Sequence, residues 1–291
     1  MAKNINAAQV KKTNQSLEVF KRFCKNPLAI IGFVIFFLFV LVSIFAPVLS
    51  KYDYATMYGD LVFKTPSLEH PFGCDRFGRD LFSRVLYGGR YSITLGVLGT
   101  ITATLLGMVF GSIAGFFGQV ADNVVMRIMD ILQAIPGILL SMVIATVLGP
   151  GMVNTVIALS VGAIPGTCRM LRGTILQIRN NEYIEAASSI NCSKARIIIK
   201  HVIPNTFAPV LVGATMGIGG TIMQAASLSF IGLGVQQPTP EWGALLSDGR
   251  NYITLYPHLI IFPGLAIGLI SLAACLLGDG LRDAMDPKLK K

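Results

Sequence analysis

The chain has 291 residues, of which 53% are hydrophobic and only 13% are charged, roughly half the charged share of a soluble domain. This composition excludes a soluble globular domain, a disordered chain and a disulfide scaffold, and it favours a protein whose solvent is lipid. The formal net charge of +9 could indicate a nucleic-acid binder, but uneven charge among the loops of a membrane protein produces the same excess.

Six uncharged apolar stretches predict an all-α, polytopic membrane protein with six transmembrane helices. They are Leu28–Leu49, Tyr91–Phe117, Ile131–Leu148, Met152–Cys168, Phe207–Val235 and Ile253–Gly278. A spanning helix needs about 20 residues. The third and fourth stretches are near the lower limit and carry Pro-Gly pairs at 136–137 and 165–166, which predicts kinked helices buried among their neighbours.

These spans divide the chain into segments. The predicted segments are a cytoplasmic N-terminal tail at 1–27, a retained first helix at 28–49, an extracytoplasmic segment at 50–90, a five-helix core at 91–278 that includes a cytoplasmic loop at 169–206, and a cytoplasmic tail at 279–291. Apolar residues at helical spacing from Leu17 to Cys24 suit a short helix on the membrane surface, and a solvated tail is an equal alternative.

The distribution of basic residues orients the spans. With the N-terminus inside, the predicted inner segments hold 17 Lys or Arg residues and the outer segments hold 7. Inner loops of membrane proteins are enriched in these residues, so both termini and the 169–206 loop are predicted to be cytoplasmic. The same asymmetry explains the net charge without a nucleic-acid partner.

The predicted spans carry no visible chemistry of their own. No Asp, Glu, Lys or Arg lies within them, which disfavours an ion-coupled secondary transporter. No nucleophile and base pair suggests a membrane-bound enzyme, and the chain has no Gly-Lys dipeptide and hence no Walker A loop. The five cysteines and three histidines are scattered, so neither a catalytic residue nor a metal or cofactor site is predicted in this chain.

Glycines at helical spacing lie within several spans. Gly107, Gly111 and Gly115 recur every four residues along the second span, and similar pairs occur in the fifth and sixth. Glycine lets helix backbones approach closely. Packing within the chain and contact with a second membrane subunit are both open.

The 169–206 segment is too long for a simple connection and predicts two helices. The first runs from Glu182 to Ile190 and the second from Ser193 to Val202, with Pro204 ending the pattern. Asn191 lies between them, where a residue with positive φ would stop the first helix, and asparagine tolerates that conformation.

This segment resembles a known family. Its Glu-Ala-Ala run, the turn position and the later His-x-x-Pro-Asn run resemble the EAA loop of the membrane subunits of bacterial ATP-binding-cassette importers, although glycine is usual at the turn. The segments 70–92, 227–243 and 277–287 narrow the resemblance to the C-type permeases of peptide and nickel importers. The resemblance covers about residues 20–288.

The resemblance implies a type I importer permease with cytoplasmic coupling helices. It implies as partners a second homologous permease, two cytoplasmic ATP-binding-cassette ATPases that bind ATP and Mg, an extracytoplasmic substrate-binding protein, and the bilayer of the bacterial inner membrane. The family's coupling positions fall on Glu185, Ala186, Ala187, Asn191, His201, Pro204 and Asn205. The chain is then not an enzyme by itself, because the ATPase sites lie on partner subunits.

The expected cargo is a di- or oligopeptide, and nickel or a metal chelate is the alternative within the same family. Because the spans lack charges, we expect the translocation path to present small polar side chains and backbone groups. The predicted lining residues are Thr215, Thr221, Gln224, Ser227 and Ser229. A role in helix packing alone is open for each of them.

Overall fold

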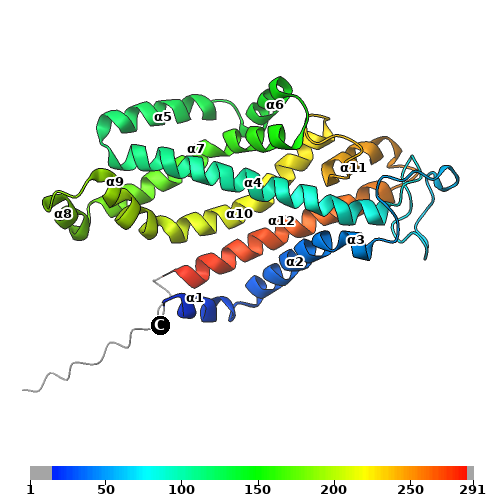
Figure 1. The fold of residues 1–291 in the computed structure, drawn as a ribbon, viewed down its shortest axis with the longest axis horizontal. Coiled ribbons are helices and arrows are strands. Elements are labelled where there is room, and N and C mark those ends of the chain that lie inside the picture. The colour runs from blue at the N-terminus through cyan, green and yellow to red at the C-terminus, as the bar shows by residue number, and fades with distance from the viewer. Residues whose placement is uncertain (1–14, 287–291) are drawn as a thin grey trace, which may run out of the picture.

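Long helices lie side by side along the longest axis of the computed structural model, which describes residues 15–286 (Figure 1). They are α2 (Pro27–Ile44), α4 (Leu81–Phe116), α7 (Met152–Arg179), α10 (Ile203–Phe230) and α12 (His258–Met285). In the described part of the chain every regular element is helical, and the one β contact is an isolated bridge between Cys74 and Asp80. The all-α prediction is therefore confirmed for these residues.

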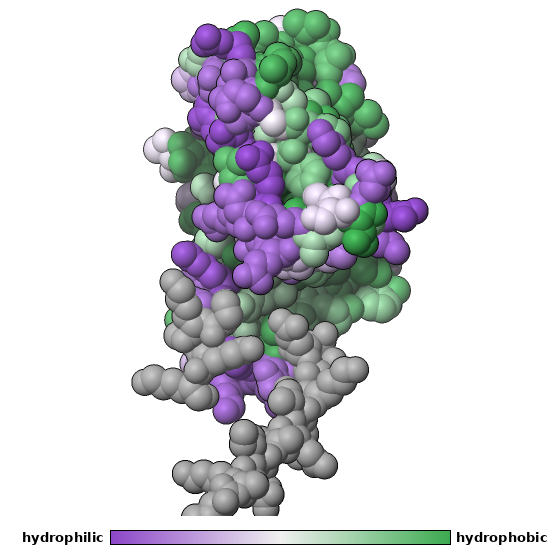
Figure 2. All heavy atoms as spheres, turned by 90° about the vertical axis from the view of Figure 1, so that its left-hand side faces the viewer, coloured by the Kyte–Doolittle hydropathy of each residue, from purple (hydrophilic) through white to green (hydrophobic). Residues whose placement is uncertain are grey.

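Shorter elements gather at the two ends of the bundle (Figure 1). One end holds α1 (Gln15–Phe23), α8 (Glu182–Ser189), α9 (Lys194–Ile197) and a π-helical turn at Ile198–Val202. The other end holds α3 (Ala46–Leu49), α11 (Trp242–Gly249) and 3-10 turns at Gly59–Leu61 and Arg250–Tyr252. Figure 2 looks onto the first end and shows polar side chains gathered there, with apolar surface on its flanks.

Four helices are long and apolar enough to cross a membrane. They are α2, α4, α12 and a continuous helix from Lys194 to Phe230 that includes α10. A fifth span is possible if α5 (Gln119–Gln133) and α6 (Gly137–Leu148), bent by 84° at their junction, count as one. The fourth predicted span lies within α7, which is not among the four, so the number six stays a prediction.

The glycines of α4 allow a close approach to α7. A Cβ atom on Gly107 would lie 2.7 Å from Cβ of Thr167, and one on Gly111 would lie 2.9 Å from the carbonyl oxygen of Cys168. Real Cβ contacts are essentially never shorter than 3.0 Å, so side chains there would force the helices apart. Of the two roles left open for this glycine face, packing within the chain is the one observed.

The segment 118–130, which separates the second and third predicted spans, forms most of α5. Its residues Val125 and Met129 are buried in a cluster that includes Ile164 and Cys168 of α7. Its acidic residues are neutralised by α7, because Arg172 bonds Asp122 and Arg169 bonds Asp130. Charges that indicate a loop in the sequence thus lie on a packed helix, since the opposite charges stand on its neighbour.

Other predicted boundaries also shift toward longer helices. α4 begins at Leu81 rather than Tyr91, α7 continues to Arg179, and α12 continues to Met285. Arg90 is accommodated in α4 because it donates to the carbonyls of Ser43 and Ile44 at the end of α2. The predicted helix near residue 20 is present as α1. Residues 1–14 and 287–291 of the predicted tails lie outside the described residues.

Candidate functional site

The turn between α8 and α9 has the backbone that the sequence predicts. Asn191 has φ of 59°, and its N–H bonds the carbonyl of Ser188 at 3.0 Å while the Cys192 N–H bonds that of Ala187 at 3.2 Å. These bonds satisfy carbonyls at the end of α8, as is common where a helix ends in a left-handed residue. Ser193 then caps α9 by accepting a bond from the Arg196 N–H. The prediction of positive φ at Asn191 is confirmed.

A small apolar core fixes this loop to the bundle. Ile184 and Ala187 of α8 and Ile197 and Val202 of the following helix are buried with Ile175 of α7. α8 therefore has one face anchored in this core and another face that is exposed. Glu185 and Ala186 lie on the exposed face. Of the isoleucines at 197–199, the first two are buried and only Ile199 is exposed.

A recess of about 930 Å³ opens beside the exposed face. Glu185 and Asn191 line it, together with Arg179 at the end of α7 and Lys194 at the start of α9. Two basic groups and one acidic group thus border a concave surface at the polar end of the molecule seen in Figure 2. Of the other predicted coupling positions, Ala187 is buried, His201 is half-buried, and Pro204 and Asn205 are exposed.

Pro204 does not end the helix, contrary to the prediction. The π-helical turn at Ile198–Val202 precedes it, Pro204 is in the first turn of α10, and the chain stays helical from Lys194 to Phe230. Proline lacks an N–H and its ring crowds the carbonyl four residues earlier, so it is tolerated where the regular hydrogen-bond ladder is already interrupted. The Asn205 side chain donates to the carbonyl of His201 at 2.6 Å, which holds the helix together across the interruption.

A groove of about 260 Å³ lies between α4, α7 and α10. It is lined mostly by small and hydroxyl-bearing residues of all three helices, together with Met170 and Val210. The small and hydroxyl-bearing residues are Thr100, Ala103, Thr104, Ala163, Gly166, Thr167, Gly213, Ala214, Gly217 and Thr221. The lining positions on α10 recur every three or four residues, so one face of that helix borders the groove. Hydroxyl groups bordering it can hydrogen-bond a polar molecule without holding a charge.

The five predicted lining residues are distributed around α10 rather than on one face. Thr221 lines the groove and bonds Thr100 across it at 2.9 Å. Thr215 and Ser229 are buried, and Ser227 bonds its own helix. Whether each of them lines a path stays a prediction.

Gln224 lies one turn beyond Thr221 and connects α10 to α6. Its side-chain amide donates to the Ser141 hydroxyl at 3.0 Å and to the Gly137 carbonyl at 3.5 Å. Ser141 in turn donates to the carbonyl of Ala158 on α7. These bonds form a polar connection at the start of α6, directly after the bend that follows α5.

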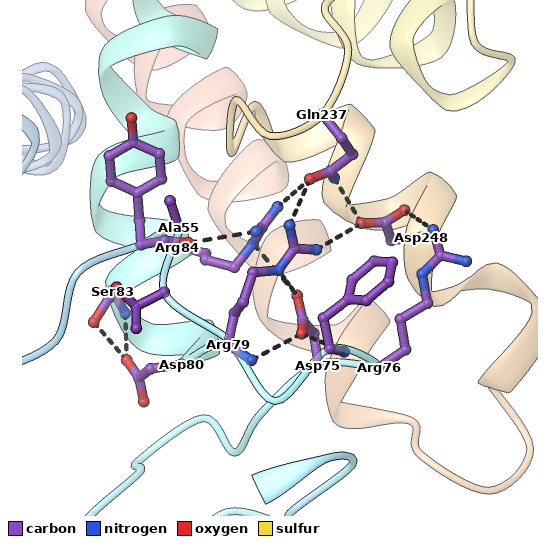
Figure 3. A network of polar contacts seen from close by, with 12 residues as sticks. Ala55, Asp75, Arg76, Arg79, Asp80, Ser83, Arg84, Gln237 and Asp248 are labelled. Atoms are coloured by element: carbon purple, nitrogen blue, oxygen red, sulfur yellow. Dashed lines mark hydrogen bonds and ion pairs between the residues drawn. The ribbon is translucent and has the colours of Figure 1, made fainter. Parts of the chain in front are cut away.

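A polar network ties the segment before α4 to the loop after α10 (Figure 3). Arg79 pairs with Asp75 at 2.7 Å and also donates to Gln237 and Asp248. Arg84 donates to Gln237 at 2.8 Å, and Gln237 donates to Asp248 at 2.6 Å. Both guanidinium groups are almost fully buried, so their charges are balanced by the two carboxylates and not by solvent.

Two further acidic side chains cap the N-termini of helices beside this network. Asp80 caps α4 by accepting bonds from the Ser83 N–H and hydroxyl, and it also bonds His70 at 2.8 Å. Glu241 caps α11 and accepts a bond from Ser92 of α4. Sequence analysis assigned these residues no role beyond the family resemblance. The signal that could have indicated the caps is an Asp or Glu directly before the first residue of a helix.

Burial shifts the pKa of several groups in and beside this network. It raises the pKa of the Glu241 carboxyl, and it raises that of Asp248 against the opposing effect of Arg76, Arg84 and Arg79. Burial, with the nearby Asp80 and Asp75, raises the pKa of the Cys74 thiol to about 11. One side-chain atom each of His70, Cys74 and Asp80 lies within 4.8 Å of the other two. The hydrogen bond between His70 and Asp80 and the isolated β-bridge between Cys74 and Asp80 hold these residues together.

Comparisons with known proteins connect these features to a family. Residues 107–291 match the family described as binding-protein-dependent transport system inner membrane component. The chain belongs to this family. Residues 14–66 separately match the N-terminal TM domain of oligopeptide transport permease C.

Relatives of this permease are named for the transport of peptides. The chain is 44% identical over 273 residues to the dipeptide transport system permease protein DppC of Alkalihalophilus pseudofirmus, covering 94% of this chain and 90% of the relative. It is 43% identical over 274 residues to the glutathione transport system permease protein GsiD of Escherichia coli O6:K15:H31, with the same coverages. The GsiD of Pectobacterium atrosepticum is 40% identical, covering 94% and 91%.

The permease is therefore a multi-pass protein of the inner membrane and a subunit of an ATP-binding-cassette importer of the peptide and nickel family. As a transport permease it belongs to a family of non-catalytic subunits.

Proposed function

We propose that this permease forms half of the translocation path of an importer for short peptides and couples that path to two cytoplasmic ATPases through the loop from Glu182 to Asn205. In this proposal both termini and the loop are cytoplasmic, ATP and Mg bind to the ATPases, and a substrate-binding protein delivers cargo from outside. A second, homologous permease supplies the other half of the path.

The geometry of the loop is the observation that carries the coupling part. An element that transmits force must be anchored to the spans on one side and free to bind a partner on the other. Ile184 and Ala187 anchor α8 to α7 and to the helix before α10, while Glu185 is exposed beside a recess lined by Arg179 and Lys194. The recess and its polar rim fit a cytoplasmic protein better than lipid.

Short peptides are the proposed cargo because of the relatives' names and the uncharged groove. Dipeptides and glutathione are both small polar molecules with at least one amide group, and hydroxyls such as those of Thr100 and Thr221 can hydrogen-bond that group. Glutathione is a specific candidate because relatives named for it are almost as similar as the one named for dipeptides.

A charge reversal tests the coupling. Glu185→Lys should lower both peptide uptake and the amount of ATPase that copurifies with the permease, while membrane insertion stays normal. Glu182→Lys is the matched control, because Glu182 is also exposed in the first turn of α8 but does not line the recess. Uptake and copurification that are unchanged in Glu185→Lys, or equally reduced in both variants, would contradict the proposed docking role.

Uptake assays test the cargo. Vesicles holding the complete importer should accumulate labelled dipeptide, and unlabelled glutathione should compete if both use the same path. Accumulation of nickel without any peptide uptake would assign the permease to the metal branch of the family instead.

A further inference from the structure

One face of α5 is polar although the helix lies at membrane depth. Asn123, Arg127 and Asp130 follow one another at intervals of three or four residues and are all exposed, and the exposed Ala134, directly after the end of α5, continues this row. We call these four positions the polar face of α5, of which the first three carry polar side chains. The residue after each of them, namely Val124, Ile128, Ile131 and Ile135, is apolar and also exposed, so an apolar face runs beside the polar one.

The depth of α5 follows from its packing on α7. α5 shares a buried cluster with Ile164 and Cys168, which lie 12 and 16 residues beyond the first residue of α7. At 1.5 Å per residue these positions are about 18 and 24 Å along α7, within the roughly 30 Å of a hydrocarbon core. α7 begins beside the loop after α10, where the Gly151 N–H bonds the Gly234 carbonyl. With both termini cytoplasmic, as proposed above, this loop lies outside and α5 lies in the inner half of the membrane.

The bend after α5 exposes backbone at a similar depth. The Ala134 N–H bonds the Asp130 carbonyl and the Leu140 N–H bonds the Pro136 carbonyl. Within residues 15–286 no donor bonds the carbonyls of residues 131–135, most of which belong to exposed residues. Lipid cannot satisfy such carbonyls, and irregular backbone at membrane depth occurs where it is buried in protein or borders water.

The charges on this face do not cancel. Asp130 pairs with Arg169 and Asp122 pairs with Arg172, whereas Arg127 has no acidic partner among the described residues. An exposed guanidinium in the inner half of a membrane needs either water or an anion.

We propose that the polar face of α5 borders a water-filled passage for cargo, and that Arg127 attracts a carboxylate of the cargo as it passes. The passage supplies water to the free carbonyls and to the charged side chains. The adjacent apolar face is left for lipid or for a partner helix. The part concerning the carboxylate rests on the peptide cargo proposed above, and the part concerning water does not.

Adjacent pairs of positions give a test at matched depth. Single cysteines at 123 and 124, 127 and 128, 130 and 131, and 134 and 135 would be made after the five native cysteines are replaced, and each variant would be studied in the complete importer in membranes. A hydrophilic methanethiosulfonate carrying a quaternary ammonium group, applied from either side, should label the first member of each pair at least tenfold faster. Labelling would be measured without nucleotide and with the ATPases trapped by vanadate.

Three results would overturn the proposal. If Asn123→Cys and Arg127→Cys are labelled and Ala134→Cys is not, water reaches only the start of α5, and the native Arg127 side chain extends to the lipid headgroups instead of bordering a passage. Absence of labelling at all four polar positions in both states would show that a partner subunit buries this face, and equal labelling within the pairs would also refute it. None of these measurements needs transport of a peptide, so they succeed or fail independently of the cargo.

Uptake kinetics test the role of Arg127. Arg127→Gln should raise the KM for a peptide with a free terminal carboxylate by about threefold, which is the size expected for a solvent-exposed charge pair. The KM for the same peptide with an amidated C-terminus should not change. Arg127→Lys should restore the original KM. Equal changes for both peptides would remove the carboxylate from the proposal.

Discussion

The buried pair of Arg79 and Arg84 depends on Asp75, and the substitution Asp75→Asn tests how strongly. The Asp75 carboxylate accepts bonds from the backbone N–H groups of Phe77 and Arg79 and pairs with the Arg79 Nε at 2.7 Å. Asparagine can keep the two backbone bonds, because one oxygen suffices for them. It cannot neutralise the guanidinium groups, and its NH2 group cannot accept the Arg79 Nε bond, so the variant removes the ion pair and leaves the backbone bonds in place.

The expected cost follows from the burial of the network. Breaking a buried ion pair by removing one partner typically costs about 3–5 kcal/mol. Asp248 and Gln237 still bond the guanidinium groups in the variant, so we expect the low end of that range, about 3 kcal/mol. At 1.4 kcal/mol per factor of ten, the population of molecules in which the segment before α4 opens should rise by about 150-fold.

Cys74 is a reporter of that opening within the same segment. It is completely buried, and its raised pKa of about 11 keeps it a thiol, so it should react with alkylating reagents only when the segment opens. The alkylation rate of Cys74, measured with the other four cysteines replaced, should therefore rise by about two orders of magnitude in Asp75→Asn.

Asp53→Asn provides the matched control. Asp53 also accepts bonds from two backbone N–H groups, those of Ala55 and Thr56, but it is exposed and pairs with no arginine in the described chain. Its replacement should leave the alkylation of Cys74 unchanged. Equal rates in the two variants, with normal membrane insertion, would refute the reasoning that Asp75 neutralises buried charge.

Three further predictions concern other parts of the fold. Gly111→Ala should destabilise the permease by about 1–3 kcal/mol, because its Cβ would meet the backbone of α7, whereas Gly173→Ala, with open space around it, should be neutral in thermal unfolding. Asn191→Gly should keep full transport and Asn191→Val should impair assembly, since glycine adopts positive φ without strain and a β-branched residue is strongly strained there; equal assembly of both would contradict this. Cysteines at Ser189 and Ser247 should label from opposite sides of the membrane, and labelling of both from outside would contradict the orientation drawn from the basic residues.

Much of the helical bundle could be predicted from the sequence because apolar stretches without charges have few alternatives. The positive φ at Asn191 was also predictable, since it depends on local sequence alone. The bounds of α5 and α7 were not, because Asp122 and Arg172 are 50 residues apart and only the fold shows that they neutralise each other. A charged residue in a stretch considered alone suggests that the stretch is exposed to water. The same residue can lie on a packed helix when an oppositely charged residue of a neighbouring helix faces it.

Of the candidate sites, one was predictable from local sequence and the other was not. The loop from Glu182 to Asn205 could be located from a local motif, whereas the groove between α4, α7 and α10 depends on which faces of the three helices meet. Five small polar residues of α10 were predicted to line a path, and only Thr221 borders that groove. Serine and threonine serve helix packing as often as a surface, because their hydroxyls can bond a carbonyl of their own helix, as Ser227 does.

The unbroken helix from Lys194 to Phe230 has a mechanical consequence. Near Gly219 and Thr221 it is held by two neighbours, since Ser271 of α12 donates to the Gly219 carbonyl and Thr221 bonds Thr100 of α4. At 1.5 Å per residue, the arm from this contact to Lys194 is about 38 Å long and the arm to Phe230 about 17 Å. If the helix tilts as a rod by about 10° around this contact, its Lys194 end moves by about 7 Å and its Phe230 end by about 3 Å in the opposite direction. The helix is then a lever with unequal arms, which converts a large displacement at the Lys194 end into a smaller, opposite one at the Phe230 end.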